Sequence, residues 1–170
     1  KINLISTYEK WWNGGKEEYE EKTPLNFAAE TGNLEIFKIL LSHPKIRVNK
    51  ELIEFYTMQN LLWLYKRKET SLLIAIDKKH YEIVKLLLEN KKTDINALSI
   101  LEYRALKYKR KKQFKTPLFL AVENNDKQMV ELLLSYKKID IKNGLMNIGG
   151  GPKLDSEKSI GIYDPYKRKD

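Results

Sequence analysis

One short segment occurs three times in this chain, and its repetition limits the possible folds more than any other feature. The copies are residues 22–29, 69–76 and 115–122, and their threonines lie 47 and 46 residues apart. Each copy is followed at the same distance by an apolar block, at residues 36–41, 83–88 and 129–134. Fixed spacing of this kind is the signature of units that stack into one array, since each unit cannot bury its apolar residues alone.

Each unit predicts a helix, a turn and a second helix. In the first unit, Thr23 is a typical N-cap residue, and Pro24 takes the first helical position, where its missing N–H is not needed. Gly32 supplies the left-handed residue that ends this helix, and Asn33 caps the next one. The corresponding cap positions in the other units are Thr70, His80, Thr116 and Asp126. We therefore expect helix pairs over residues 23–43, 70–89 and 116–136.

The pattern resembles the ankyrin repeat, whose signature is Thr-Pro-Leu-His-x-Ala before a pair of antiparallel helices. The residues that carry the resemblance are Thr23, Pro24, Leu25, Ala28, Thr70, Leu72, Ala75, Thr116, Pro117, Leu118 and Ala121. It covers about residues 22–142 and implies a mainly α repeat solenoid. It also implies a non-catalytic module that binds other proteins through a concave face made by fingers and first helices.

Two departures from the family pattern affect the turns. The signature histidine, which the resemblance implies forms hydrogen bonds between loops, is replaced by Asn26, Leu73 and Phe119. That network must therefore be replaced or absent. The glycine between the helices survives only as Gly32, with Lys79 and Asn125 in the other two places. Asparagine tolerates the left-handed conformation better than lysine, so we expect the turn at Lys79 to be strained or differently shaped.

The period is longer than the usual ankyrin period of about 33 residues, and the extra residues precede each threonine. We expect these connectors to form long β-hairpin fingers at residues 1–21, 50–68 and 97–114. Asn13-Gly14 predicts a tight hairpin turn in the first. Apolar residues alternate in the second, and a turn is expected near residues 103–105 in the third. A short third helix per repeat is the alternative, because residues 61–65 are apolar all round.

The ends of the units predict how the array begins and finishes. Each unit closes with a segment that we expect to be extended, at residues 46–49, 93–96 and 139–142. Ile2 and Asn3 match such a closing segment, so we expect an earlier unit in a longer array. Residues 1–142 are thus interpreted as the repeat array. Residues 143–170 contain Gly149-Gly150-Gly151-Pro152 and form a C-terminal tail, which either caps the last repeat or docks elsewhere.

The amino-acid composition argues against several classes of protein. Hydrophobic residues make up 42% of the 170 residues, which argues against global disorder. The chain has no cysteine and only two histidines, His43 and His80, both expected at helix ends. We therefore expect no catalytic constellation, metal site or cofactor, and no enzyme activity. The sequence contains no long uncharged apolar run, so it predicts no transmembrane segment. We expect a cytoplasmic location.

Charge and aromatic residues indicate where a partner binds. The net charge is +9, which favours an acidic partner, and the third connector with Lys115 carries seven basic residues against one glutamate. All three tryptophans lie in the connectors, and Trp and Tyr commonly anchor protein interfaces. The candidate partner-binding residues are Trp12, Trp63, Tyr65, Arg104, Lys107, Tyr108, Lys109, Arg110, Lys111 and Lys112.

Three other interpretations of these residues stay open. The chain could be a structural component of a large intracellular assembly, such as a cytoskeletal one. The basic third finger could bind nucleic acid or another anionic surface, since aromatic residues among cations can stack on bases. Alternatively, this finger is a solvated hairpin whose aromatic residues only pack against neighbouring fingers.

Overall fold

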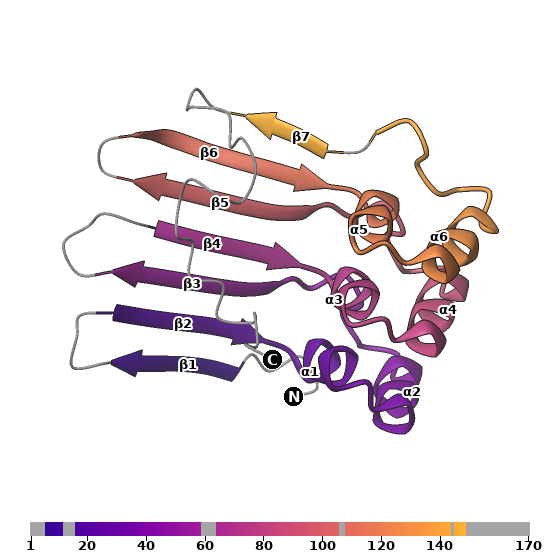
Figure 1. Ribbon diagram of the computed structural model, residues 1–170. Coiled ribbons are helices and arrows are strands. Elements are labelled where there is room, and N and C mark those ends of the chain that lie inside the picture. The colour runs from indigo at the N-terminus through magenta and orange to yellow at the C-terminus, as the bar shows by residue number, and fades with distance from the viewer. Residues whose placement is uncertain (1–5, 12–15, 59–63, 106–107, 144, 149–170) are drawn as a thin grey trace, which may run out of the picture.

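The computed structural model describes residues 6–11, 16–58, 64–105, 108–143 and 145–148, in which three helix pairs adjoin an antiparallel sheet (Figure 1). The helices are α1 (Pro24–Thr31), α2 (Leu34–Ser42), α3 (Ser71–Asp77), α4 (Tyr81–Glu89), α5 (Pro117–Glu123) and α6 (Lys127–Leu134). The strands are β1 (Ser6–Trp11), β2 (Lys16–Lys22), β3 (Leu52–Met58), β4 (Leu64–Glu69), β5 (Ser99–Ala105), β6 (Tyr108–Lys115) and β7 (Leu145–Ile148). The predicted solenoid of helix–turn–helix repeats is confirmed.

The helices begin at the predicted N-cap residues, but only some of these caps form a side-chain hydrogen bond. Thr23 and Thr116 accept backbone N–H groups of α1 and α5, and Asn33 and Asp126 do the same for α2 and α6. In the second repeat, Thr70 and His80 occupy the cap positions without such a bond. The second repeat therefore lacks a local contribution of about 1 kcal/mol per helix that the other two have.

The turn inside each helix pair keeps a left-handed residue. Gly32 has a φ of 72°, Lys79 of 60° and Asn125 of 50°. The second repeat thus has the same turn shape, and its lysine bears a strain of about 1–2 kcal/mol that a glycine avoids. At Gly32 space matters as well, because an added Cβ would lie 2.5 Å from Cε1 of His80 in the next repeat.

The hydrophobic core lies between two layers of helices and continues from repeat to repeat. Figure 1 shows α1, α3 and α5 beside the strands, with α2, α4 and α6 farther out. The signature alanines Ala28, Ala75 and Ala121 are at most 2% exposed, and their small side chains let the first helices pack closely. Leu87 and Leu133 of the outer helices are fully buried. Most residues of the apolar stripes predicted from the sequence therefore contribute to one continuous core, whereas Ile36 and Leu134 of these stripes are half-exposed.

The end of the stack at α1 and α2 exposes residues that are buried elsewhere. Ile83 of α4 and Met129 of α6 are 1% and 0% exposed, whereas Ile36, their counterpart in α2, is 50% exposed. Likewise, Phe27 of α1 is 57% exposed and Ile74 of α3 is 3% exposed. We call the surface around Phe27, Ile36 and Ile39 the end face. It is the side on which a preceding repeat would pack.

All seven strands belong to one antiparallel sheet, ordered β1 to β7 as in the sequence. Strands of successive repeats also pair with each other, β2 with β3, β4 with β5 and β6 with β7. The turn predicted near residues 103–105 is wrong, since β5 continues to Ala105. A helix was the alternative for residues 61–65, but residues 64 and 65 lie in strand β4. The predicted Asn13-Gly14 turn and residues 61–63 lie outside the described residues.

The sheet also includes part of the predicted tail. Strand β7 lies after residue 142, in the predicted tail, and it pairs with β6. The boundary of the array at that residue stays a prediction, and residues 149–170 lie outside the described part of the chain.

The segments that close each unit, which were expected to be extended, form no strand, and the first two contain turns at residues 48–49 and 95–96. Asn49 Nδ2 donates to the Lys92 carbonyl at 2.8 Å, and Asn49 Oδ1 accepts from Asp94 N at 2.9 Å. Asn96 bonds in the same way to the Lys138 carbonyl and to Asp140 N, at 2.9 and 2.8 Å. An asparagine side chain can satisfy backbone groups of the next loop, so no strand pairing is needed here. We call this series of bonds the asparagine ladder.

Candidate functional site

In the first and third repeats, a lysine at the end of a strand reaches the last turn of the helix that follows. Lys22 of β2 donates to Glu30 of α1 at 2.6 Å, and Lys115 of β6 donates to Glu123 of α5 at 2.6 Å. Each lysine precedes its glutamate by eight residues, so the pair connects the sheet to the first helix of the repeat. These contacts mark the corner where the strands and the first helices meet.

The second repeat builds this corner from different residues. Glu69 stands where the other repeats have lysine, and Arg67, two residues earlier in β4, forms ion pairs with both Glu69 and Asp77. Its guanidinium also lies 3.8 Å from Glu54, the residue paired with it on β3. Ser99 of β5 donates its hydroxyl to Glu69 at 2.7 Å. We call these five residues the charged corner.

Burial controls the electrostatics of the charged corner. Glu54 and Glu69 are each 3% exposed, and Oε2 of Glu54 has no hydrogen-bond partner. Burial raises the pKa of Glu54, and Arg67 offsets this rise only in part. Burial alone would lower the pKa of Arg67, but Glu69, Glu54 and Asp77 raise it, so the guanidinium stays charged. One half-buried cation thus holds three carboxylates together, which favours a structural role.

Both histidine side chains contact backbone groups. His43 accepts from the Lys45 N–H at 3.2 Å, and His80 Nε2 lies 3.1 Å from the Glu30 carbonyl. In the described part of the chain, no group of three His, Cys, Asp or Glu side chains could hold a metal ion.

The candidate partner-binding residues fall on three strands or outside the described residues. Trp12, Trp63 and Lys107 lie outside. Tyr65 lies in β4 and Arg104 in β5, and the others lie in β6, namely Tyr108, Lys109, Arg110, Lys111 and Lys112. Lys112 is 3.5 Å from Glu102 of β5, so this cation is already paired within the sheet.

Backbone pairing brings three tyrosine positions into one row across the sheet. Tyr65 pairs with Tyr56 on one side and Tyr103 on the other. The row continues to Glu18 of β2 beyond Tyr56 and to Lys111 of β6 beyond Tyr103. We call Tyr56, Tyr65 and Tyr103 the tyrosine row. Only Tyr65 and Lys111 were among the sequence candidates, because the row depends on strand register.

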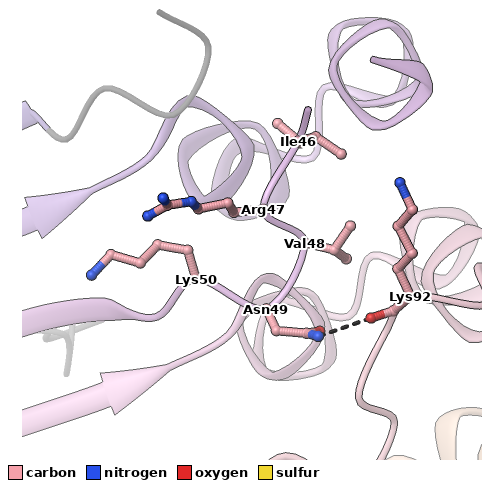
Figure 2. Close-up of a pocket in the computed structure, with 6 residues that line it drawn as sticks. All are labelled: Ile46, Arg47, Val48, Asn49, Lys50 and Lys92. Carbon is pink, nitrogen blue, oxygen red and sulfur yellow. Dashed lines mark hydrogen bonds between the residues drawn. The ribbon is translucent and has the colours of Figure 1, made fainter. Parts of the chain in front are cut away.

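A shallow depression of about 410 Å³ lies in the loop between α2 and β3, and it too was missed. Ile46 and Val48 line it together with three cations, Arg47, Lys50 and Lys92. Figure 2 shows the side chains of Arg47 and Lys50 extending to the same side of this loop. The spacing of basic residues after each outer helix was the sequence signal that could have revealed it.

Comparison with known proteins agrees with the repeat architecture. A profile of ankyrin repeats in three copies matches residues 4–99 and 49–144. No curated protein matches the chain. Among the described residues, no helix is long and apolar enough to cross a membrane. Ankyrin repeats generally mediate protein–protein interaction and typically carry no catalytic activity. Since the matches span most of its length, the chain belongs to the ankyrin repeat family.

Proposed function

We propose that this chain is a non-catalytic scaffold that binds a protein with an acidic surface, through the tyrosine row and the basic strand β6. The observation that supports this is the pairing of Tyr56, Tyr65 and Tyr103 next to Lys111. Aromatic anchors beside cations are typical of interfaces whose partner is acidic. The contact residues proposed are those of the sequence prediction together with Tyr56 and Tyr103.

The position of the tyrosine row in the sheet suits this role. Tyr56 and Tyr65 lie two residues beyond Glu54 and Arg67 in their strands, so the two rows of positions share one face of the pleated sheet. Arg67 reaches Asp77 at the end of α3 from that face. A partner on the tyrosine row would therefore also lie near the first helices.

Capture from cell extract tests this proposal. The variant with Lys109→Glu and Lys111→Glu is compared with a control carrying Lys38→Glu and Lys85→Glu, which changes the same charge on outer helices α2 and α4. We expect the finger variant to lose a specific protein that the wild type and the control both recover. Equal recovery by all three would contradict the proposal. Loss of the partner after nuclease treatment would favour nucleic acid instead.

We also infer that the chain works within a longer array, because the end face exposes Phe27, Ile36 and Ile39 at 57%, 50% and 70%. Ile74 and Ile83, the counterparts of Phe27 and Ile36, are buried in the second repeat, which packs on the first. A photo-crosslinking residue at position 36 of the natural full-length protein tests this. A crosslink to another ankyrin-type helix pair is expected, and a crosslink to unrelated protein would contradict it.

A further inference from the structure

The three loops that follow the outer helices are all basic. Residues 43–50, 90–97 and 135–143 contain eight cations and only two acids. The cations are Lys45, Arg47, Lys50, Lys91, Lys92, Lys137, Lys138 and Lys142. All except Lys50 are exposed, and Lys50 is half-buried. We call this set the loop strip.

Three of these lysines occupy equivalent places in successive repeats. Lys45, Lys92 and Lys138 are separated by 47 and 46 residues, the same spacing as the repeats themselves. The asparagine ladder binds the backbone carbonyls of Lys92 and Lys138, at 2.8 and 2.9 Å, and so fixes each loop against the one before it. Since adjacent helices pack about 10 Å apart, the ladder holds one lysine about every 10 Å along the array.

The two acids of the loops do little to neutralise this charge. Asp94 accepts the backbone N–H of Asn96, and Asp140 accepts those of Lys142 and Asn143. Their carboxylates thus cap turns of their own loops. The hydrogen bonds with Asn143 and Lys142 lower the pKa of Asp140. Within the strip, Lys92 Nζ donates to the Pro44 carbonyl at 3.3 Å, whereas on the neighbouring outer helices Lys38 pairs with Glu35 and Lys85 with Glu82.

We propose that the loop strip binds an extended acidic segment of a protein, laid along the array across all three repeats. A chain in the extended polyproline II conformation rises about 3.1 Å per residue with three residues per turn, so acidic side chains at every third residue lie on one face, and their spacing matches that of the lysines. Single-stranded nucleic acid fits less well. Tyr136, the one Phe, Tyr or Trp residue of the three loops, packs against the core, which leaves only the imidazole of His43 as an exposed ring for stacking. Seven of the eight cations are lysines, whereas arginine is preferred where phosphate is read in a bidentate manner.

This surface is separate from the tyrosine row, so each can be tested alone. The probe is a fluorescein-labelled peptide with glutamate at every third position, and its binding to the whole chain is followed by fluorescence anisotropy. The test variant carries Lys45→Gln, Lys92→Gln and Lys138→Gln. The control carries Lys38→Gln, Lys85→Gln and Lys127→Gln, which removes the same charge from the outer helices. Thermal unfolding is measured for both, to compare their folding.

We expect the strip variant to bind about tenfold more weakly, since three exposed ion pairs are lost, and the control to stay within about twofold. Arginine at the same three positions should keep the affinity, and this second variant also guards against a folding defect. Equal weakening of both glutamine variants would overturn the proposal, because it would show only an effect of net charge. Tighter binding of a single-stranded oligonucleotide or of phosphatidylserine vesicles, lost in the strip variant, would overturn the choice of an acidic peptide.

Discussion

Asn26 and Leu73 occupy the same place in the first helices of adjacent repeats, and their surroundings differ accordingly. Asn26 accepts from Thr23 N at 3.0 Å and donates to the Lys50 carbonyl and to Ser71, so it replaces the missing signature histidine between loops. Leu73 is fully buried and offers no such bonds, and the hydroxyl of Thr70 has no hydrogen-bond partner. The polar network is thus replaced in the first repeat and absent in the second.

The second repeat holds together by other means. It has neighbours on both sides, and its charged corner connects two strands and a helix through Arg67. The first repeat has local caps and the half-buried ion pair of Lys22 with Glu30, but it leaves Ile36 half-exposed. The difference shows that position in the array, rather than the repeat signature, decides how each repeat is stabilised. The predictions below test this contrast.

Replacing Arg67 with methionine should have the largest effect. It leaves Glu54 and Glu69 buried without their cation, and such losses cost about 3–5 kcal/mol. Chemical denaturation at neutral pH measures the free energy of unfolding. The matched change Lys115→Met removes an ion pair to a glutamate that is 44% exposed, and should cost no more than about 1 kcal/mol. Equal costs would show that the charged corner adds nothing special to the second repeat.

Truncating the equivalent isoleucines should separate the middle repeat from the end repeat. Ile83→Ala leaves a cavity between repeats and should cost about 2–5 kcal/mol. Ile36→Ala acts on a half-exposed side chain and should cost about 0.5 kcal/mol. The same denaturation measurement applies, and a large cost at Ile36 would mean that the end face is covered in solution.

Removing the cap hydroxyls should affect only the first of the two repeats. Thr23→Val loses the cap of α1 and should cost about 1–2 kcal/mol. Thr70→Val removes a buried hydroxyl that has no partner, so stability should stay unchanged or rise slightly. Thermal unfolding can compare the two variants, and a similar loss in both would indicate that Thr70 forms an unseen bond.

Glycine at position 79 should stabilise the second repeat. Lys79→Gly relieves the left-handed strain and should raise the free energy of unfolding by up to about 1 kcal/mol, after the entropy that glycine costs in the unfolded chain. Asn125→Gly is the control and should gain less, since asparagine tolerates this conformation. No gain at position 79 would mean that the lysine side chain contributes compensating contacts.

The smallest effect concerns the pH dependence caused by Glu54. Its pKa is raised in the folded state, so the folded chain keeps this proton to higher pH and loses stability as pH rises above the ordinary value of 4.5. Glu54→Gln removes that loss. At neutral pH, the free energy of unfolding of the variant should exceed that of the wild type by less than about 1 kcal/mol. At a pH under the ordinary carboxyl pKa, the two proteins should be equally stable. Denaturation at several pH values checks this, and a constant difference would contradict the assignment.

Local signals in the sequence predicted much of the helical part of the fold. Threonine, proline and glycine act on their own neighbours, so Thr23, Pro24 and Gly32 locate α1 without knowledge of the rest of the chain. The left-handed turn at Lys79 was harder to predict from the sequence, because the repeat context imposes a conformation that lysine itself disfavours.

The candidate site was less accessible to prediction, because it depends on which strands pair and in which register. Arg67 contacts Glu54 only because β3 and β4 align those residues, and position 65 lies opposite position 103 only because strands of two repeats pair. A shift by one residue would send each side chain to the other face. The loop strip was missed for another reason, because its cations are scattered in the sequence and come together only through stacking.

The sheet also has a mechanical consequence. Strands β2 and β3, and likewise β4 and β5, join successive repeats through backbone hydrogen bonds that point along the axis of stacking. An array held by helix faces alone can flex by sliding one face over another. Here any stretching or straightening must lengthen interstrand hydrogen bonds directly. The molecule should therefore extend little under an applied pulling force. Above a threshold force, the repeats should separate abruptly, one junction after another.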